Sequence, residues 1–190
     1  MLLQVILVST REGRHGPAVA RWFHEHAVTN GKFDVELVDL ADVNLPLFDE
    51  PHHPRLANYL RDHTKAWSAI VSRADAFVFV TPEYNFSSPP SLVNALDYLS
   101  HEWAYKPAAF VSYGGISGGT RSVQMSKQIM TTLRMVTIFE AVNIPMFTQL
   151  IDRHTGVFNA TDVHAKAADA LLNELLRWAR ALKAMREEGK

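Results

Sequence analysis

A ten-residue turn that carries three chemically capable side chains is the strongest functional signal in the sequence. Residues 81–90 read Thr-Pro-Glu-Tyr-Asn-Phe-Ser-Ser-Pro-Pro. The prolines on both sides stiffen this turn, and Glu83, Tyr84 and Asn85 within it offer a carboxylate, a phenol and an amide. A rigid loop with such side chains is typical of a binding site rather than of a simple connection.

A second segment has the composition of an anion-binding loop. Residues 9–17 read Ser-Thr-Arg-Glu-Gly-Arg-His-Gly-Pro. Pro17 suits the first position of a helix, where free N–H groups and the helix dipole attract anions. Ser9, Arg11 and Arg14 add hydroxyl and guanidinium donors. The glycine patterns of dinucleotide and P-loop sites are absent, so a terminal phosphate monoester is the expected ligand.

A third segment is rich in glycine. Residues 112–119 read Ser-Tyr-Gly-Gly-Ile-Ser-Gly-Gly. Glycines let a backbone approach a flat ligand closely. We therefore expect amides of this loop, near Ser112, Gly114 and Gly115, to line the edge of a planar heterocycle.

The same glycines also fit a competing hypothesis, a serine hydrolase. Residues 115–119 match Gly-x-Ser-x-Gly, and Asp152 and then His154 or His164 follow Ser117 in the order of the α/β-hydrolases. Against this alternative, no oxyanion loop of the His-Gly-Gly-Gly type is found, and the turn at 81–90 would have no role.

The apolar patterns alternate between strands and helices along the whole chain. We predict strands at Leu2–Val8, Val35–Leu40, Ala76–Val80, Ala108–Ser112 and Asn143–Phe147. We predict helices at Pro17–Ala27, at Arg55–Arg73, at Thr120–Glu140 and at Asp162–Arg186. A further helix follows the turn at 81–90 and continues to about Trp103. Such alternation indicates an α/β, flavodoxin-like three-layer sandwich, with a five-stranded parallel sheet in the order 2-1-3-4-5. All three loops then follow strands, at the edge where such folds bind ligands.

The bulk composition narrows the classes of function. The 190 residues carry a net charge of −1 and no cysteine, which suits a single domain spanning residues 1–190 in the cytoplasm. Near neutrality gives no electrostatic case for nucleic acid or a membrane as partner. The nine histidines show no metal-ligand spacing, so no metal site is expected.

Taken together, these segments resemble the NADPH-dependent FMN reductase family, flavodoxin-like proteins that include quinone, chromate and azo-dye reductases. Residues 81–85 match the Thr-Pro-Glu-Tyr-Asn motif of this family at every position, and Asn94 and Asp97 fall in its Asn-Ala-x-Asp motif. Residues 9–11 resemble its phosphate loop, and Gly118-Gly119-x-Arg121 its later glycine motif. Phe86 departs from the histidine found in many relatives, which makes the mouth of the pocket more apolar.

The resemblance implies an FMN site, NADPH as reductant, and a quinone, free flavin or similar planar acceptor. The FMN phosphate would lie on Ser9, Arg11, Arg14, His15 and Gly16. The isoalloxazine would rest against Pro82, Glu83, Tyr84 and Asn85, with Ser112, Gly114 and Gly115 at the far edge. No catalytic side chain is needed, because the flavin carries the chemistry. Members are homodimers or homotetramers, and the helix at Leu92–Trp103 would contribute to the interface. A non-enzymatic flavodoxin-type electron carrier is an alternative, although such carriers are usually strongly acidic.

Overall fold

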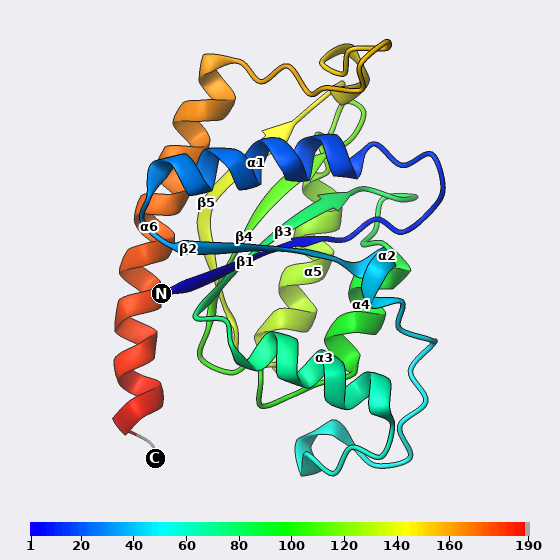
Figure 1. Cartoon of the computed structure of the whole chain (residues 1–190), viewed down its shortest axis with the longest axis vertical. Helices are drawn as coiled ribbons and strands as arrows, with labels where there is room; N and C mark the ends of the chain where they lie inside the picture. Colours follow the sequence, from blue (N-terminus) through cyan, green and yellow to red (C-terminus); the bar gives the residue numbers. More distant parts are fainter. Residues whose placement is uncertain (189–190) are drawn as a thin grey trace.

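Five parallel strands form one sheet at the centre of the molecule (Figure 1). The computed structural model describes residues 1–188. From one edge to the other, the strands are β2 (Asp34–Asp39), β1 (Leu2–Leu7), β3 (Ala76–Pro82), β4 (Pro107–Tyr113) and β5 (Val136–Ile144). Each neighbouring pair is parallel. The predicted fold class and the strand order 2-1-3-4-5 are therefore confirmed.

Helices cover both faces of the sheet and complete the three layers. One face packs against α1 (Gly16–Asn30) and α6 (Asp162–Glu188). The other face packs against α3 (Asp62–Ser72), α4 (Pro90–Asp97) and α5 (Thr120–Thr132). The short helix α2 (Leu40–Val43) and the 3₁₀ turns η1 (Pro54–Leu56) and η2 (Phe147–Gln149) lie in the connections.

The central strand β3 explains why the sheet is buried on both sides. Its odd and even residues point to opposite faces. The small residues Ala76, Val78 and Val80 face the layer of α1 and α6. Phe77 and Phe79 face the other layer, where they pack near Trp103. Because both faces are apolar, the strand appears in the sequence as an unbroken apolar run.

The predicted helix at Thr120–Glu140 and the predicted strand at Asn143–Phe147 are wrong in their boundaries. Helix α5 ends at Thr132, and β5 begins at Val136. The chain reverses at Arg134, which has a left-handed φ of 60°. Glycine usually occupies such a position, so the sequence contains no signal that the helix stops there. Phe147 belongs to η2 rather than to the strand.

The two helices that precede and follow β3 are shorter than predicted. The segment expected as one helix at Arg55–Arg73 divides into η1 and α3, separated by residues 57–61, which have no regular secondary structure. Glu50 accepts the backbone N–H groups of Leu60 and Arg61 at 3.0 and 2.9 Å and so stabilises the late start of α3. Helix α4 ends at Asp97, and hydrogen-bonded turns continue to Tyr105.

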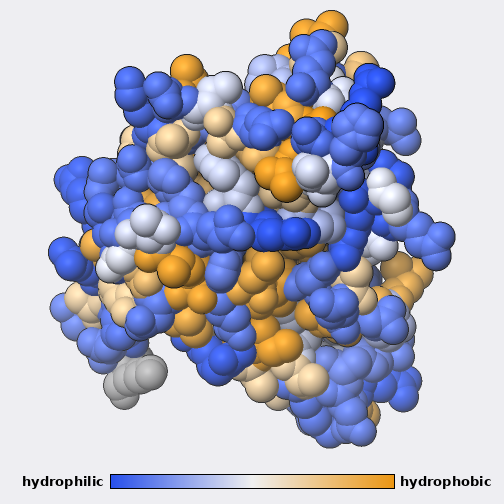
Figure 2. Space-filling view, turned by 45° about the horizontal axis from the view of Figure 1, so that its top comes forward, coloured by the Kyte–Doolittle hydropathy of each residue, from blue (hydrophilic) through white to orange (hydrophobic). Residues whose placement is uncertain are grey.

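The surface carries separate apolar patches among hydrophilic side chains (Figure 2). On the connection between α2 and α3, the side chains of Leu47 and Leu56 are largely exposed. Among residues 1–188, no helix combines the length and the apolar character needed to cross a membrane, including the 27-residue α6.

Candidate functional site

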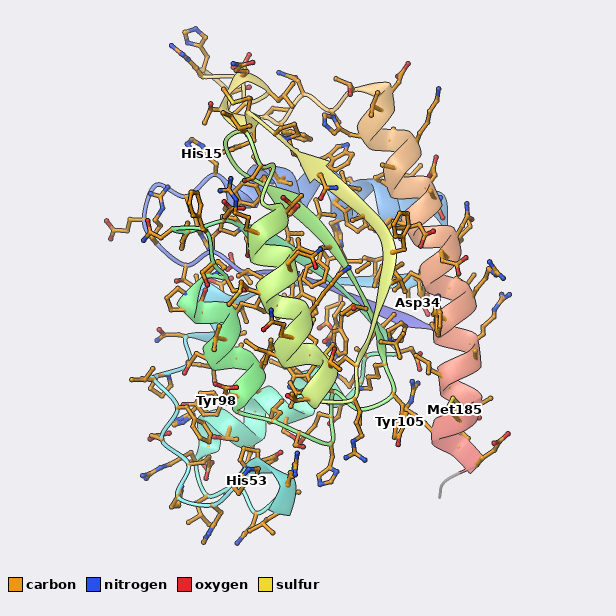
Figure 3. The ribbon with its side chains drawn as sticks, turned by 180° about the vertical axis from the view of Figure 1, so that it is seen from behind. His15, Asp34, His53, Tyr98, Tyr105 and Met185 are labelled. Carbon is orange, nitrogen blue, oxygen red and sulfur yellow. The ribbon has the colours of Figure 1, made fainter. Side chains whose placement is uncertain are left out.

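The three predicted loops meet at the carboxyl edge of the sheet. The β1–α1 loop, the turn after β3 and the loop after β4 enclose a cavity of about 200 Å³. Its walls are formed by Arg11, Arg14, His15, Pro82, Glu83, Tyr84, Tyr113, Gly114, Gly115 and Phe147. In Figure 3, His15 lies at this edge, whereas Asp34 and Tyr105 lie at the opposite edge.

The first wall is the amino terminus of α1. This end of the helix has no side-chain cap, a proline in its first turn and no acidic residue there. The positive end of the helix dipole is therefore not neutralised locally, which favours an anion. The exposed Arg11 hydrogen-bonds only to the carbonyl oxygen of Glu12, at 3.3 Å, among residues 1–188. Its remaining guanidinium donors are available to a ligand.

Gly16 is required where α1 meets the strands beneath it. A Cβ atom at this position would lie 2.3 Å from Ser9 Oγ and 2.6 Å from the Tyr113 hydroxyl. These two hydroxyl oxygens are 3.3 Å apart and buried. Ser9 and Gly16 therefore form the floor under the loop rather than part of the cavity wall.

Arg14 differs from Arg11 because a carboxylate already holds it. Its guanidinium donates to both carboxylate oxygens of Asp39, at 2.8 and 2.6 Å, and to the carbonyl oxygen of Ser9. The hydrogen bond to Asp39 raises the pKa of Arg14, so its charge is permanent. Asp39 also accepts the N–H of Ala41 at 2.9 Å. This ion pair ties the β1–α1 loop to the end of β2.

The turn after β3 is a tight hairpin. Tyr84 and Ser87 exchange two backbone hydrogen bonds of 3.1 and 2.9 Å. The residues between them, Asn85 and Phe86, both have positive φ angles of 49° and 66°, as in a two-residue type I′ turn. Asn85 is exposed at the tip and does not line the cavity.

Glu83 joins this turn to the glycine-rich loop. Its carboxylate accepts hydrogen bonds from the Ser117 hydroxyl at 2.9 Å, from the backbone N–H of Arg121 at 3.1 Å and from the Arg121 guanidinium at 2.7 Å. The Glu83 side chain is only 7% exposed. Because every donor comes from residues 117–121, the carboxylate fixes the two loops relative to each other.

The glycine-rich loop is shaped by Ser112 and Gly119. The Ser112 hydroxyl is buried, 2.8 Å from the carbonyl oxygen of Gly118, and it does not line the cavity. Gly119 has a φ of 85°, and a Cβ atom on it would lie 2.9 Å from Ser112 Cβ. The N–H of Gly114 is bonded to Ile144 at 3.2 Å, whereas the N–H of Gly115 donates to no protein group among residues 1–188.

Two aromatic residues that the sequence did not predict, Tyr113 and Phe147, complete the cavity wall. The rings of Tyr113 and Phe147 are 5.1 Å apart, and the His15 ring lies 5.5 Å from Phe147. Burial raises the pKa of Tyr113 to about 12, so its hydroxyl keeps its proton. Tyr113 carries a sequence signal, because it directly follows the predicted strand at Ala108–Ser112. Phe147 carries none, because the pattern places it at the end of a strand and not in a loop.

The serine hydrolase alternative lacks its catalytic geometry. The Ser117 hydroxyl donates to Glu83, and no imidazole within residues 1–188 hydrogen-bonds to it. His164 instead contacts Thr161 at 3.1 Å. Asp152 accepts backbone N–H groups from His154 and Thr155, both at 2.8 Å. Over the same residues, no group of three or more acidic, histidine or cysteine side chains could hold a metal ion.

These observations describe an α/β protein whose carboxyl edge combines an uncapped helix start with a cavity walled by arginine, aromatic and glycine residues. Comparison with known proteins identifies the family. Residues 1–149 match the model of the NADPH-dependent FMN reductases. An NAD(P)H-dependent FMN reductase of Schizosaccharomyces pombe is 45% identical over 133 residues, which are 69% of this chain and 66% of that protein. The chain belongs to the NADPH-dependent FMN reductase family.

A further relative supports this assignment, and a solved structure shares the fold. A quinone reductase of Pseudomonas putida is 33% identical over 137 residues, covering 69% of this chain and 70% of that protein. The structure of the NAD(P)H:(acceptor) oxidoreductase FerB from Paracoccus denitrificans aligns with a TM-score of 0.74 and 20% identity, over 95% of this chain and 97% of that one. The resemblance seen in the sequence is confirmed, and an FMN- and NAD(P)H-using oxidoreductase is supported over the carrier and hydrolase alternatives.

Proposed function

We propose that this protein binds FMN in the cavity at the carboxyl edge and transfers electrons from NAD(P)H to a quinone, free flavin or similar planar acceptor. The observation that carries this proposal is the convergence of an uncapped helix terminus, Arg11 and a pocket walled by flat side chains. The first two features suit a phosphate, and the third suits a ring system.

The donor set fits the two ends of FMN. The phosphate would take the free N–H groups at the start of α1 and the guanidinium of Arg11. Arg14 would contribute its charge while Asp39 holds the loop in shape. Ser9 and Gly16 would support this loop from below, with His15 beside it.

The ring system would contact Pro82, Glu83 and Tyr84 on one side and Gly114 and Gly115 on the other. The N–H groups of Asn85 and Gly115 donate to no protein acceptor among residues 1–188, so they remain available to polar atoms of a bound ring. Those of Tyr84 and Gly114 are already used within the protein. Ser112 would act through the loop that it fixes.

Bound FMN would supply the redox chemistry, a two-electron transfer from NAD(P)H to the acceptor. The protein's contribution is to bind, orient and shield. Tyr113 keeps its proton, and Glu83 is committed to Arg121 and Ser117. Neither residue needs to act as nucleophile or general base, so we assign no catalytic side chain.

We also propose that the protein works in the cytoplasm as a homodimer or homotetramer. The absence of cysteine suits a reducing compartment. Leu47, Leu56 and Leu60 are 85%, 68% and 53% exposed on one connection, and a second copy of the chain would shield them. Light scattering after size-exclusion chromatography tests the assembly, and a monomer at micromolar concentration would contradict it.

The function is tested by an absorption spectrum of the purified protein before and after anaerobic addition of NADPH. We expect a flavin spectrum that bleaches with NADPH and returns when a quinone is added. As a control, flavin-stripped protein should regain the spectrum when titrated with FMN. A colourless protein that takes up no FMN in the titration would overturn the proposal.

A further inference from the structure

Phe86 occupies a position that is costly for its residue type. It is the second central residue of the hairpin turn and has a φ of 66°. Left-handed backbone suits glycine and asparagine, but it crowds the Cβ atom of a bulky side chain. Burial does not compensate for this cost, because Phe86 is 69% exposed. An exposed aromatic ring on unfavourable backbone needs a reason other than packing within the chain.

One face of the Phe86 ring is held in place. The Arg121 guanidinium carbon lies over this ring, 3.8 Å from its centroid. Arg121 is itself anchored by the buried carboxylate of Glu83, at 2.7 Å. A guanidinium stacked on a ring face attracts it electrostatically, so the ring is fixed while much of it stays open to solvent.

The held ring belongs to the turn that forms part of the cavity wall. Glu83 and Tyr84, which directly precede the tip of the turn, are wall residues, whereas Phe86 is not. Contacts therefore run from Glu83 in the wall to Arg121 and from Arg121 to the exposed ring of Phe86.

We propose that Phe86 is a stacking platform for the planar ring of the electron acceptor and that Arg121 is the residue that positions it. This inference rests on the proposed function and deepens it by assigning the residue that distinguishes flat aromatic acceptors from compact ones. Offset stacking of two rings favours a flat aromatic acceptor over a compact inorganic one of similar reactivity. Phe86 would therefore determine specificity rather than participate in the chemistry.

The test compares two acceptors, 2-methyl-1,4-naphthoquinone and ferricyanide, with NADPH as donor. For Phe86→Leu we expect kcat/KM for the naphthoquinone to fall about three- to tenfold, the range of a lost aromatic pair. The value for ferricyanide should stay within a factor of about 1.5, because an octahedral anion cannot stack. Phe86→Tyr should restore the naphthoquinone value, since it keeps the ring.

Two further variants separate positioning from general damage. Arg121→Gln should lower the naphthoquinone value, and combining it with Phe86→Leu should lower it no further, because both act on one ring. Phe86→Asn should lose the preference for the naphthoquinone while its thermal midpoint stays equal or rises, since asparagine tolerates left-handed backbone.

Phe139→Leu is the matched control, because Phe139 is 92% exposed on the edge strand β5. This variant should leave kcat/KM for both acceptors unchanged. The inference is overturned if Phe86→Leu lowers kcat/KM equally for both acceptors, or, like the control, for neither. Wild-type protein that binds FMN but oxidises NADPH with neither acceptor would instead overturn the proposed function.

Discussion

The two edges of the sheet use their charged groups in opposite ways. At the amino edge, Lys106 donates to the carbonyl oxygens of Val71 and Ser72 at 2.9 and 3.1 Å. Arg186 donates to the Tyr105 carbonyl oxygen and to Asp75, at 2.7 and 3.1 Å. These cations complete the fold. At the carboxyl edge, Arg11 and the start of α1 keep donors free.

This difference shows that polar groups at the amino edge bond within the protein, whereas some of those at the carboxyl edge remain available to a ligand. A strand end can be closed by a cation that satisfies backbone carbonyls, or it can be left with donors that only a ligand satisfies. Arg14 links the two uses. Its own donors are taken by protein groups, but its ion pair with Asp39 preserves the shape of the loop in which Arg11 remains available to a ligand. Substitutions at the two edges should therefore divide into effects on stability and effects on ligand binding.

The largest effect should come from removing both arginines of the binding edge. For Arg11→Ala combined with Arg14→Ala, we expect FMN affinity to fall roughly 100-fold or more, since Arg11 loses charged hydrogen bonds of about 1.5–3 kcal/mol each and Arg14 no longer supplies its charge or holds the loop through Asp39. Fluorescence titration of the stripped protein measures the change. Arg21→Ala, at an exposed position of α1, is the control and should bind normally. A change below about threefold in the double variant would contradict the phosphate assignment.

The amino edge should respond to pH instead. Burial lowers the pKa of Lys106 to about 8 from its ordinary 10.5, with Arg186 adding to the effect. Between these values the unfolded chain holds a proton that the folded chain has lost, so stability rises with pH. The free energy of unfolding of the wild type minus that of Lys106→Met should therefore increase between pH 8 and 10.5 by up to about 3 kcal/mol.

Urea denaturation at several pH values measures this difference. Lys65→Met, where the side chain is 56% exposed, is the control and should show no such slope. A difference that stays flat with pH would mean that Lys106 is charged at no cost, and the contrast between the edges would lose its support. FMN affinity should be unchanged in Lys106→Met.

Gly16→Ala should damage the floor of the binding edge by crowding it. The new Cβ atom would lie 2.3 Å from Ser9 Oγ and 2.7 Å from Leu7 Cδ1. Overpacking of this kind costs about 1–3 kcal/mol, and chemical denaturation measures the loss. The control is Gly115→Ala, because a Cβ atom there would meet nothing within 4 Å. Equal stability of the two variants would contradict the tight packing beneath the loop.

The smallest effect should come from Arg186, because a second cation lies beside its carboxylate partner at the amino edge. Arg186→Gln loses the charged hydrogen bonds to Asp75 and to the Tyr105 carbonyl oxygen, but Lys183 lies 3.5 Å from the same Asp75 carboxylate and remains. We expect stability to fall by about 0.5–1 kcal/mol, measured by thermal unfolding, with FMN affinity unchanged. A change in FMN affinity would show that the two edges are coupled.

The sequence predicted the order of the sheet because the interior strands are largely apolar runs, with Gln4 of β1 as a polar exception, between helical patterns. It failed where a boundary depends on tertiary contacts. Helix α5 ends at Thr132, just before Arg134 adopts a left-handed conformation, and α3 starts where Glu50 accepts a backbone N–H. Neither boundary has a local signature in the sequence. The helix prediction therefore continued into β5.

For the candidate site, the sequence predicted which loops meet and most of the residues that line the cavity. It did not predict how those residues are used. The pairing of Arg14 with Asp39 and of Glu83 with Arg121 joins positions 25 and 38 residues apart. Spacing along the chain does not encode such pairs, and they decide which donors remain free.

The ion pair between Arg14 and Asp39 has a consequence for sequence variation. Both side chains are less than one-fifth exposed, so replacing either residue alone leaves a partly desolvated charge without its counterpart. These two positions should therefore change together among related proteins, a covariation that links the end of β2 to a loop it does not adjoin in the sequence.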